Sequence, residues 1–235
     1  YKLVSKSKIN NINVDLMLAL PNQTIEDLEE SLQKVINLKP NHISLYSLIL
    51  EEGTKLEKMV SEDIVKLPEE DMEREMYWKT KRILEKNGYN HYEISNFAKE
   101  GCKSKHNMNC WSQKEYLGFG VAAHSYVNRK RYCNTNNIEE YISNIKKGKI
   151  ENNRTVCEIQ NKIDEQKEFM MLGLRKIDGI DIQEFKNKFV ENPIYVFHKE
   201  LEKLVNKDLV EIDLDKIKLT NKGLDFANLV WEEFV

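Results

Sequence analysis

The chain has 235 residues, of which 40% are hydrophobic and 32% are charged, and its formal net charge is -3. A chain of this length forms one large domain or two small ones. No stretch approaches the roughly 20 apolar residues of a membrane-spanning helix, and the slight acidic excess gives no electrostatic reason to expect nucleic acid as a partner. The first residues, Y-K-L-V-S-K-S-K, lack the apolar core of a signal peptide, so we expect a cytoplasmic protein with reduced thiols.

The N-terminal part predicts a strand, a helix and a second strand. Residues 11–20 are a near-continuous apolar run, typical of a strand buried on both faces of a parallel sheet. Thr24 is a good N-cap for a helix that ends at Pro40, and residues 42–50 predict the second strand. Asp15 lies within the first strand, where a buried carboxylate needs either a backbone partner or a ligand. We therefore expect a right-handed βαβ unit with one unexplained acid.

The central part mixes helices and strands. A long helix is predicted over residues 68–87, a strand over 91–98 and a loop over 99–113. Residues 115–133 predict a strand, a turn and a second strand, and residues 137–148 predict an amphipathic helix that ends at a glycine.

The C-terminal part has the pattern of a winged-helix module. Helices are predicted over residues 160–175, 181–189 and 195–206, followed by a hairpin over 209–219 and a helix over 220–231. Winged helices often bind DNA, but few basic residues cluster on the third helix. This favours a role in protein packing or as a lid.

Six segments occur in this order along the chain: I-N-V-D-L-M-L-A-L-P-N-Q-T, H-I-S-L-Y-S-L-I-L-E-E-G-T, Y-E-I-S-N-F-A, H-N-M-N-C-W, E-Y-L-G-F-G-V-A-A-H-S and F-M-M-L-G-L-R. Together they resemble the radical S-adenosylmethionine family of oxygen-independent coproporphyrinogen III oxidase and its relative, the heme chaperone HemW. The resemblance covers nearly the whole chain. The H-N-x-x-x-W and G-F-G-x-x-A-H-S segments look closer to HemW than to the oxidase.

The resemblance implies an α/β fold (α+β overall) in three parts. Residues 1–98 would be the C-terminal part of a partial open (β/α) barrel, residues 99–157 a substrate-facing loop and hairpin region, and residues 158–235 a winged-helix-like C-terminal domain of the HemN type. The family's [4Fe–4S] cluster sits on C-x-x-x-C-x-x-C and binds S-adenosylmethionine. This sequence lacks that motif, so we expect a C-terminal fragment of a longer protein that does not turn over alone.

The resemblance also implies site residues near the cofactor. Asp15 falls where the family has an aspartate that contacts S-adenosylmethionine, and Ile49 lies near a position whose backbone touches the same cofactor. His124 matches a position near the active-site mouth. Gly118 and Gly120 would let the backbone approach a flat ligand closely.

The segment H-N-M-N-C-W resembles H-N-x-x-Y-W, which is implicated in heme binding in HemW-like proteins. His106, Asn107 and Trp111 match, and Cys110 replaces the tyrosine. An imidazole is a common axial ligand of heme iron and an indole packs on a macrocycle, whereas Cys110 would either strengthen an iron site or only remove a phenol hydrogen bond. No catalytic residue is assigned. The remaining histidines are expected to be structural: His42, His91 and His198.

Three functions remain open at this point. The first is a HemW-like part that holds heme and passes it to an acceptor protein, with its cofactor site completed by the missing N-terminal half. The second is an authentic oxidase that converts porphyrinogen propionates to vinyls, for which Arg129, Lys130 and Arg131 are candidate carboxylate partners. The third is a non-catalytic docking module.

Overall fold

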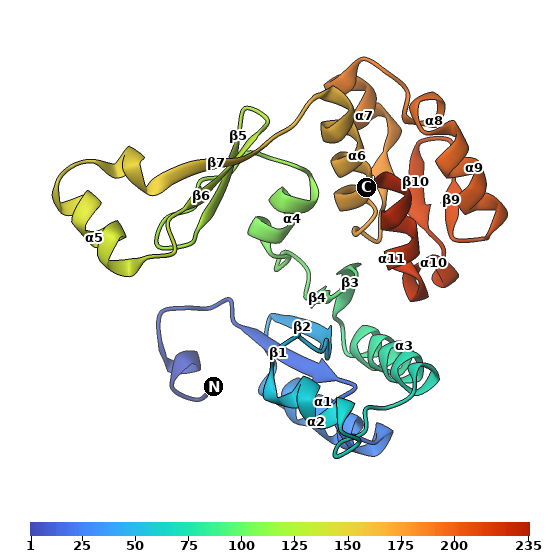
Figure 1. The fold of residues 1–235 in the computed structure, drawn as a ribbon. Coiled ribbons are helices and arrows are strands. Elements are labelled where there is room, and N and C mark those ends of the chain that lie inside the picture. Colours follow the sequence, from blue (N-terminus) through green and yellow to red (C-terminus); the bar gives the residue numbers. More distant parts are fainter. The chain divides into compact units, whose positions relative to one another are not determined.

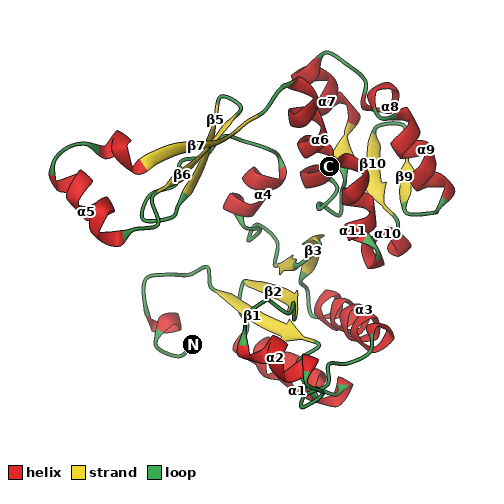
Figure 2. Cartoon of the chain, viewed as in Figure 1, coloured by secondary structure: helices red, strands yellow, loops and turns green.

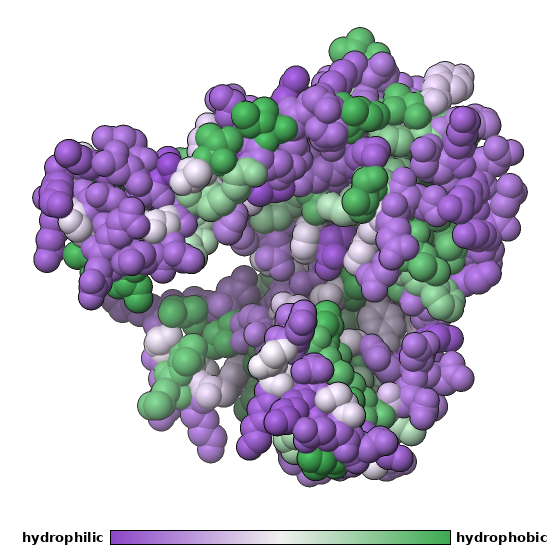
Figure 3. All heavy atoms as spheres, viewed as in Figure 1, coloured by the Kyte–Doolittle hydropathy of each residue, from purple (hydrophilic) through white to green (hydrophobic).

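The computed structural model describes all residues, Tyr1–Val235, and divides into two compact units, Tyr1–Ser104 and Lys105–Val235. Helices accompany three separate sheets (Figure 2). The chain is thus mixed α/β without a closed barrel, as the sequence predicts. None of the helices combines the length and the apolar character needed to cross a membrane. The side chains visible in Figure 3 are mostly hydrophilic, with hydrophobic ones in scattered groups.

The first unit is built on a four-stranded sheet (Figure 1). Its elements are η1 (Val4–Lys6), β1 (Asn13–Leu18), α1 (Ile25–Leu38), β2 (His42–Ser47), α2 (Lys55–Ser61), α3 (Glu70–Lys86), β3 (Asn90–Glu93) and β4 (Asn96–Ala98). The strand order is β1-β2-β4-β3, with β1 and β2 parallel and β4 antiparallel to β2. The predicted βαβ unit is confirmed.

Helix α1 begins and ends where the sequence predicts. The Thr24 side chain and the Asp27 side chain each accept a hydrogen bond from the other's backbone N–H, which satisfies two free donors of the first turn. Lys39 takes a left-handed conformation with φ 55° just before Pro40. The side chains on the inner face are fully buried or nearly so: Leu28, Leu32 and Val35.

Two predictions for this unit are wrong. Strand β1 is an edge strand, and one of its faces is open, so that Asp15 and Met17 are exposed rather than buried on both faces. Residues 91–98 form the hairpin of β3 and β4 instead of one strand. The fully buried Glu93 accepts hydrogen bonds from the Ser95 backbone N–H and from the Asn96 side chain, which stabilises the turn.

The second unit begins with a short helix and an antiparallel meander. Its elements are α4 (Lys105–Trp111), β5 (His124–Val127), β6 (Lys130–Asn134), α5 (Ile138–Lys146), η2 (Ile150–Asn153) and β7 (Arg154–Ile159). The strand order is β5-β6-β7. Asn128 and Arg129 connect β5 to β6 with φ values of 51° and 60°, which suit the right-handed twist of a tight hairpin. In Figure 1, α5 lies at one end of this three-stranded sheet and α6 lies beyond the other end.

The rest of the unit is the helical module with its wing. Its elements are α6 (Lys162–Gly173), β8 (Ile180–Asp181), α7 (Ile182–Phe189), α8 (Pro193–Val196), α9 (His198–Asn206), β9 (Val210–Ile212), β10 (Lys216–Leu219), α10 (Asn221–Asp225), α11 (Ala227–Trp231) and η3 (Glu232–Phe234). The hairpin of β9 and β10 pairs with β8 in the order β8-β10-β9. Aromatic rings packed edge to face or tilted form much of the core: Phe169, Phe185, Phe189, Phe197 and Phe234.

Candidate functional site

The H-N-M-N-C-W segment is helix α4 rather than part of a loop, so the loop predicted over residues 99–113 is wrong in its second half. The segment carries no apolar stripe that would indicate a helix, and a helix of seven residues is marginal on its own. Its support is tertiary: the helix packs against α6, and its last residue, Trp111, contacts Arg175.

His106 and Cys110 lie side by side, one turn apart on α4. Cys110 Sγ is 3.8 Å from His106 Nε2. The imidazole is exposed, and its ring meets the ring of Tyr116 edge to face at a centroid distance of 6.5 Å. Cys110 is half-buried, and burial raises the pKa of its thiol. The helix therefore presents an accessible nitrogen donor next to a sulfur that is held in its neutral form.

Trp111 points to the winged-helix module. The Arg175 guanidinium lies 4.3 Å from the ring centroid of Trp111 and 4.7 Å from that of Trp231, so one cation contacts two indoles. The Nε1 atoms of both indoles are buried and have no hydrogen-bond partner. Asn107 is half-buried on the same helix. The contact with Arg175 was not predicted, and the packing of Trp111 on a macrocycle stays a prediction.

The two glycines after α4 have structural reasons of their own. A Cβ on Gly118 would lie 2.1 Å from the backbone oxygen of His124, and the Gly118 N–H donates to Ser125 Oγ at 2.9 Å. Gly120 has φ +107°, and its N–H donates to the Tyr141 hydroxyl. The close approach of the His124 backbone thus accounts for Gly118, and the positive φ accounts for Gly120. The approach of these glycines to a ligand stays a prediction.

The same loop exposes large apolar side chains. Leu117 is 54% exposed and Phe119 is 80% exposed, directly after the tyrosine whose ring meets His106. Contiguous exposed hydrophobic surface is typical of sites that bind an apolar molecule. These two residues were not singled out from the sequence.

The predicted cofactor contacts of the first unit lie at the surface. Asp15 accepts a hydrogen bond of 2.5 Å from Asn13 Nδ2, and Asn13 Oδ1 lies 2.6 Å from His42 Nδ1. Ile49 is 74% exposed and follows the end of β2 at Ser47, so its expected place on the strand is wrong. The contacts of Asp15 and Ile49 with S-adenosylmethionine stay predictions.

Two of the histidines expected to be structural lie inside the first unit. His42 Nε2 lies 2.7 Å from the Tyr92 hydroxyl, and burial lowers the pKa of the imidazole. The His91 ring stacks on Phe97 at 4.5 Å, and burial lowers its pKa to about 4. Both are neutral packing residues at pH 7.

A second group of donor atoms lies on the sheet β5-β6-β7. Of its residues, only His124 was among the site residues predicted from the sequence. His124, Cys133 and Cys157 bring one nitrogen and two sulfurs within 4.8 Å of one another. The Cys157 thiol hydrogen-bonds with Cys133 and raises the pKa of the Cys133 thiol. Strand β7 was not predicted, and without it Cys157 cannot be placed beside Cys133.

Two of the three basic residues at the β5–β6 turn, Arg129 and Arg131, form ion pairs within the protein. Arg129 Nε lies 3.0 Å from a carboxylate oxygen of Glu165, and Arg131 Nη2 lies 2.7 Å from one of Glu168. Lys130 between them is exposed. Because the two guanidinium groups form ion pairs within the protein, they are not free to bind a carboxylate of a ligand.

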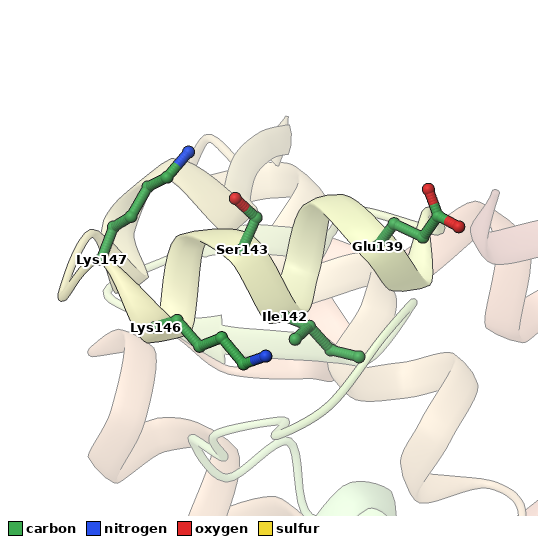
Figure 4. Close-up of a pocket in the computed structure, with 5 residues that line it drawn as sticks. All are labelled: Glu139, Ile142, Ser143, Lys146 and Lys147. Atoms are coloured by element: carbon green, nitrogen blue, oxygen red, sulfur yellow. The ribbon is translucent and has the colours of Figure 1, made fainter.

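A surface hollow of about 420 Å³ lies along α5 (Figure 4). Ile142 and Lys146 project from one side of the helix and Glu139, Ser143 and Lys147 from another. None of the candidate site residues lines it.

Comparison with known proteins identifies relatives along the whole chain. The HemN C-terminal domain family matches residues 160–226. The heme chaperone HemW of Lactococcus lactis is 37% identical over 99% of this chain and 60% of its own length, and that of Bacillus subtilis is 35% identical over 96% and 59%. The chain is a homologue of the HemW proteins. It spans about 60% of the length of these HemW relatives.

The fold agrees with this relationship. The coproporphyrinogen III oxidase HemN of Escherichia coli, a radical SAM enzyme, superimposes with a TM-score of 0.74 over 96% of this chain and 55% of that chain, at 18% identity. At this identity the match shows the HemN fold and no more. The HemW relatives are more similar to this chain in sequence, at 37% and 35% identity.

Proposed function

We propose that this chain is the heme-holding part of a HemW-like heme chaperone, with His106 as the axial ligand of the iron. The observation that carries the proposal is the His106–Cys110 pair, an exposed imidazole 3.8 Å from a neutral thiol on a helix whose following loop exposes Leu117 and Phe119. An imidazole ligates heme iron, and exposed apolar side chains suit the face of a macrocycle. In this role the chain acts in the cytoplasm and passes heme to an acceptor protein.

The thiols of the chain do not suit an iron–sulfur cluster. Cys102 belongs to the first unit, Cys110 lies on α4, and only Cys133 and Cys157 come together. A [4Fe–4S] cluster takes three or four cysteine thiolates. Cluster and S-adenosylmethionine chemistry accordingly belongs to a longer protein, in which Asp15 and Ile49 would line the cofactor.

The ion pairs of the β5–β6 turn favour the chaperone over the oxidase. An oxidase has to bind propionate carboxylates, for which guanidinium groups are the usual partners. Arg129 and Arg131 are already paired with Glu165 and Glu168. Releasing Arg131 would leave the largely buried Glu168 carboxylate without its cation, which costs about 3–5 kcal/mol for a fully buried pair, whereas Glu165 would keep its ion pair with Lys188.

The test is a hemin titration of the chain, followed at the Soret band, with His106→Ala beside it. We expect saturable one-to-one binding that weakens by at least about tenfold in His106→Ala, since an axial bond is lost. His198→Ala is the matched control, because His198 is also a helical, exposed histidine one turn from a side chain it contacts, Glu202. Equal affinity of all three proteins for hemin would contradict the proposal.

A further inference from the structure

Three donor groups come together on the sheet β5-β6-β7, whose strands are labelled in Figure 1. His124 lies on β5, Cys133 on β6 and Cys157 on β7, and the three ligand atoms lie within 4.8 Å of one another. None of them belongs to α4, which holds the proposed heme ligand. The cluster therefore calls for an explanation separate from heme binding.

The strand register explains how the three residues meet. His124 and Cys133 are directly opposite each other in the antiparallel pair β5–β6, where opposing side chains on one face have Cβ atoms about 4.5–5.5 Å apart. Between β6 and β7 the register shifts: Tyr132 pairs with Val156 and Arg131 pairs with Glu158. Cys157 is the extra residue of this bulge, and bulges commonly redirect a side chain next to a functional site.

The hydrogen bonds around the cluster leave the lone pairs of the ligand atoms available, since Cys157 Sγ donates its hydrogen to the Arg131 backbone oxygen at 3.3 Å. His124 Nδ1 lies 3.1 Å from the backbone oxygen of Ala122, and a carbonyl only accepts, so Nδ1 carries the hydrogen. In the neutral ring Nε2 then holds the lone pair. Metal-bound histidines usually donate their other ring N–H to a carbonyl or carboxylate in this way, which fixes the ring.

Two thiols and an imidazole are the ligand set of zinc. Zn–S bonds of about 2.3 Å in a tetrahedron place two sulfurs about 3.8 Å apart, so closing the cluster around an ion takes side-chain shifts of about 1 Å. His124 and Cys157 are exposed, which gives an ion access from solvent. Three protein ligands leave a fourth position for water or another ligand, as in open zinc sites.

We propose that His124, Cys133 and Cys157 bind one Zn²⁺ ion across the three strands of this sheet. The ion would join β5 to β7, which do not pair with each other. It would thus add a link across all three strands to a ribbon in which backbone pairing joins each outer strand to β6.

The experiment is a Zn²⁺ titration of the reduced, metal-free chain in competition with a chromogenic chelator, with native mass spectrometry for stoichiometry. We expect one tightly bound ion per chain. Affinity should fall by more than about a hundredfold in His124→Ala, Cys133→Ser and Cys157→Ser, since even the loss of an outer-shell partner costs about 10–100-fold. Cys102→Ser, a half-buried cysteine of the first unit, is the control and should bind like the parent.

A second readout guards against misfolded variants. Zn²⁺ should raise the Tm of the parent and of Cys102→Ser and leave that of His124→Ala unchanged, and circular dichroism should give the same spectrum for all three metal-free proteins. Zinc binding that is lost in His106→Ala or Cys110→Ala and kept in His124→Ala would overturn the proposal. So would a reduced chain that takes up no Zn²⁺ and closes a Cys133–Cys157 disulfide in air.

Discussion

The guanidinium of Arg175 lies 4.3 Å from the ring centroid of Trp111, at the end of the helix that carries His106 and Cys110. Because Arg175 also contacts Trp231 of α11, one side chain joins the candidate heme helix to the winged-helix module. Trp111 therefore has a structural role that is independent of any contact with a macrocycle.

Arg175→Ala should lower the free energy of unfolding of the second unit by about 2 kcal/mol, because a partly desolvated cation–π contact with two indoles is lost. Urea unfolding followed by tryptophan fluorescence measures this directly, since Trp111 and Trp231 both belong to this unit. Arg82→Ala removes an exposed arginine of α3 and should change the value by less than about 0.5 kcal/mol. Equal effects of the two substitutions would show that the stacked arrangement contributes little.

The two carboxylates that flank Arg131 should differ in their effect on stability. Glu168 has only 11% of its side chain exposed and also accepts from Gln113, whereas Glu158 is 42% exposed. Glu168→Gln should cost about 2–3 kcal/mol, because it removes the more buried of the two carboxylates of Arg131 and leaves only the more exposed Glu158 as its anion. Glu158→Gln should cost less than about 1 kcal/mol, as for an exposed pair. Chemical denaturation of the two variants measures the difference, and a reversed order would be incompatible with the observed burial.

His91 should make the first unit less stable in mild acid. Its ring stays neutral in the folded chain, where the pKa is about 4, but takes up a proton near pH 6.5 in the unfolded chain. The unfolded state therefore binds more protons, and stability is complete above pH 6.5 and falls as the pH drops toward 4, by at most about 3 kcal/mol. Unfolding curves between pH 4 and 8 measure this slope. His91→Gln should flatten it, and an unchanged slope would show that other groups cause it.

Cys110 should not ligate heme iron at neutral pH. Burial raises the pKa of the thiol, so thiolate ligation would first have to overcome this unfavourable deprotonation, whereas a neutral imidazole needs none. The Soret spectrum of the hemin complex at pH 7 should therefore be the same in Cys110→Ala and in the parent. A thiolate-type spectrum that disappears in Cys110→Ala would instead make the sulfur the ligand.

The sequence predicts the elements that local signals define. The Thr24 cap, the glycine after α5 and the turn of the β5–β6 hairpin each lie within a few residues of the element that they end or join, and the structure has all three. A resemblance carried by six ordered segments indicates the family, and the HemW relatives confirm it.

The errors concern features that depend on distant residues. Whether Asp15 is buried depends on β1 being an edge strand, and α4 depends on a cation supplied from Arg175. The cluster of His124, Cys133 and Cys157 depends on the register of three strands, including a bulge that has no sequence signature here. Spacing along the chain contains none of this information, because strand pairing brings together residues that are far apart in sequence.

The shortness of α4 has a consequence for any ligand bound at His106. A helix of seven residues is marginal on its own, so the orientation of His106 depends on tertiary contacts of α4, among them the contact of Trp111 with Arg175. Coupling of this kind is reciprocal. A ligand that prefers the ordered helix slows amide hydrogen exchange in α4, and a partner that displaces the Trp111 indole lowers the affinity for the ligand by the same factor. An acceptor protein that displaced Trp111 would lower the affinity for a ligand at His106 without competing for the iron itself.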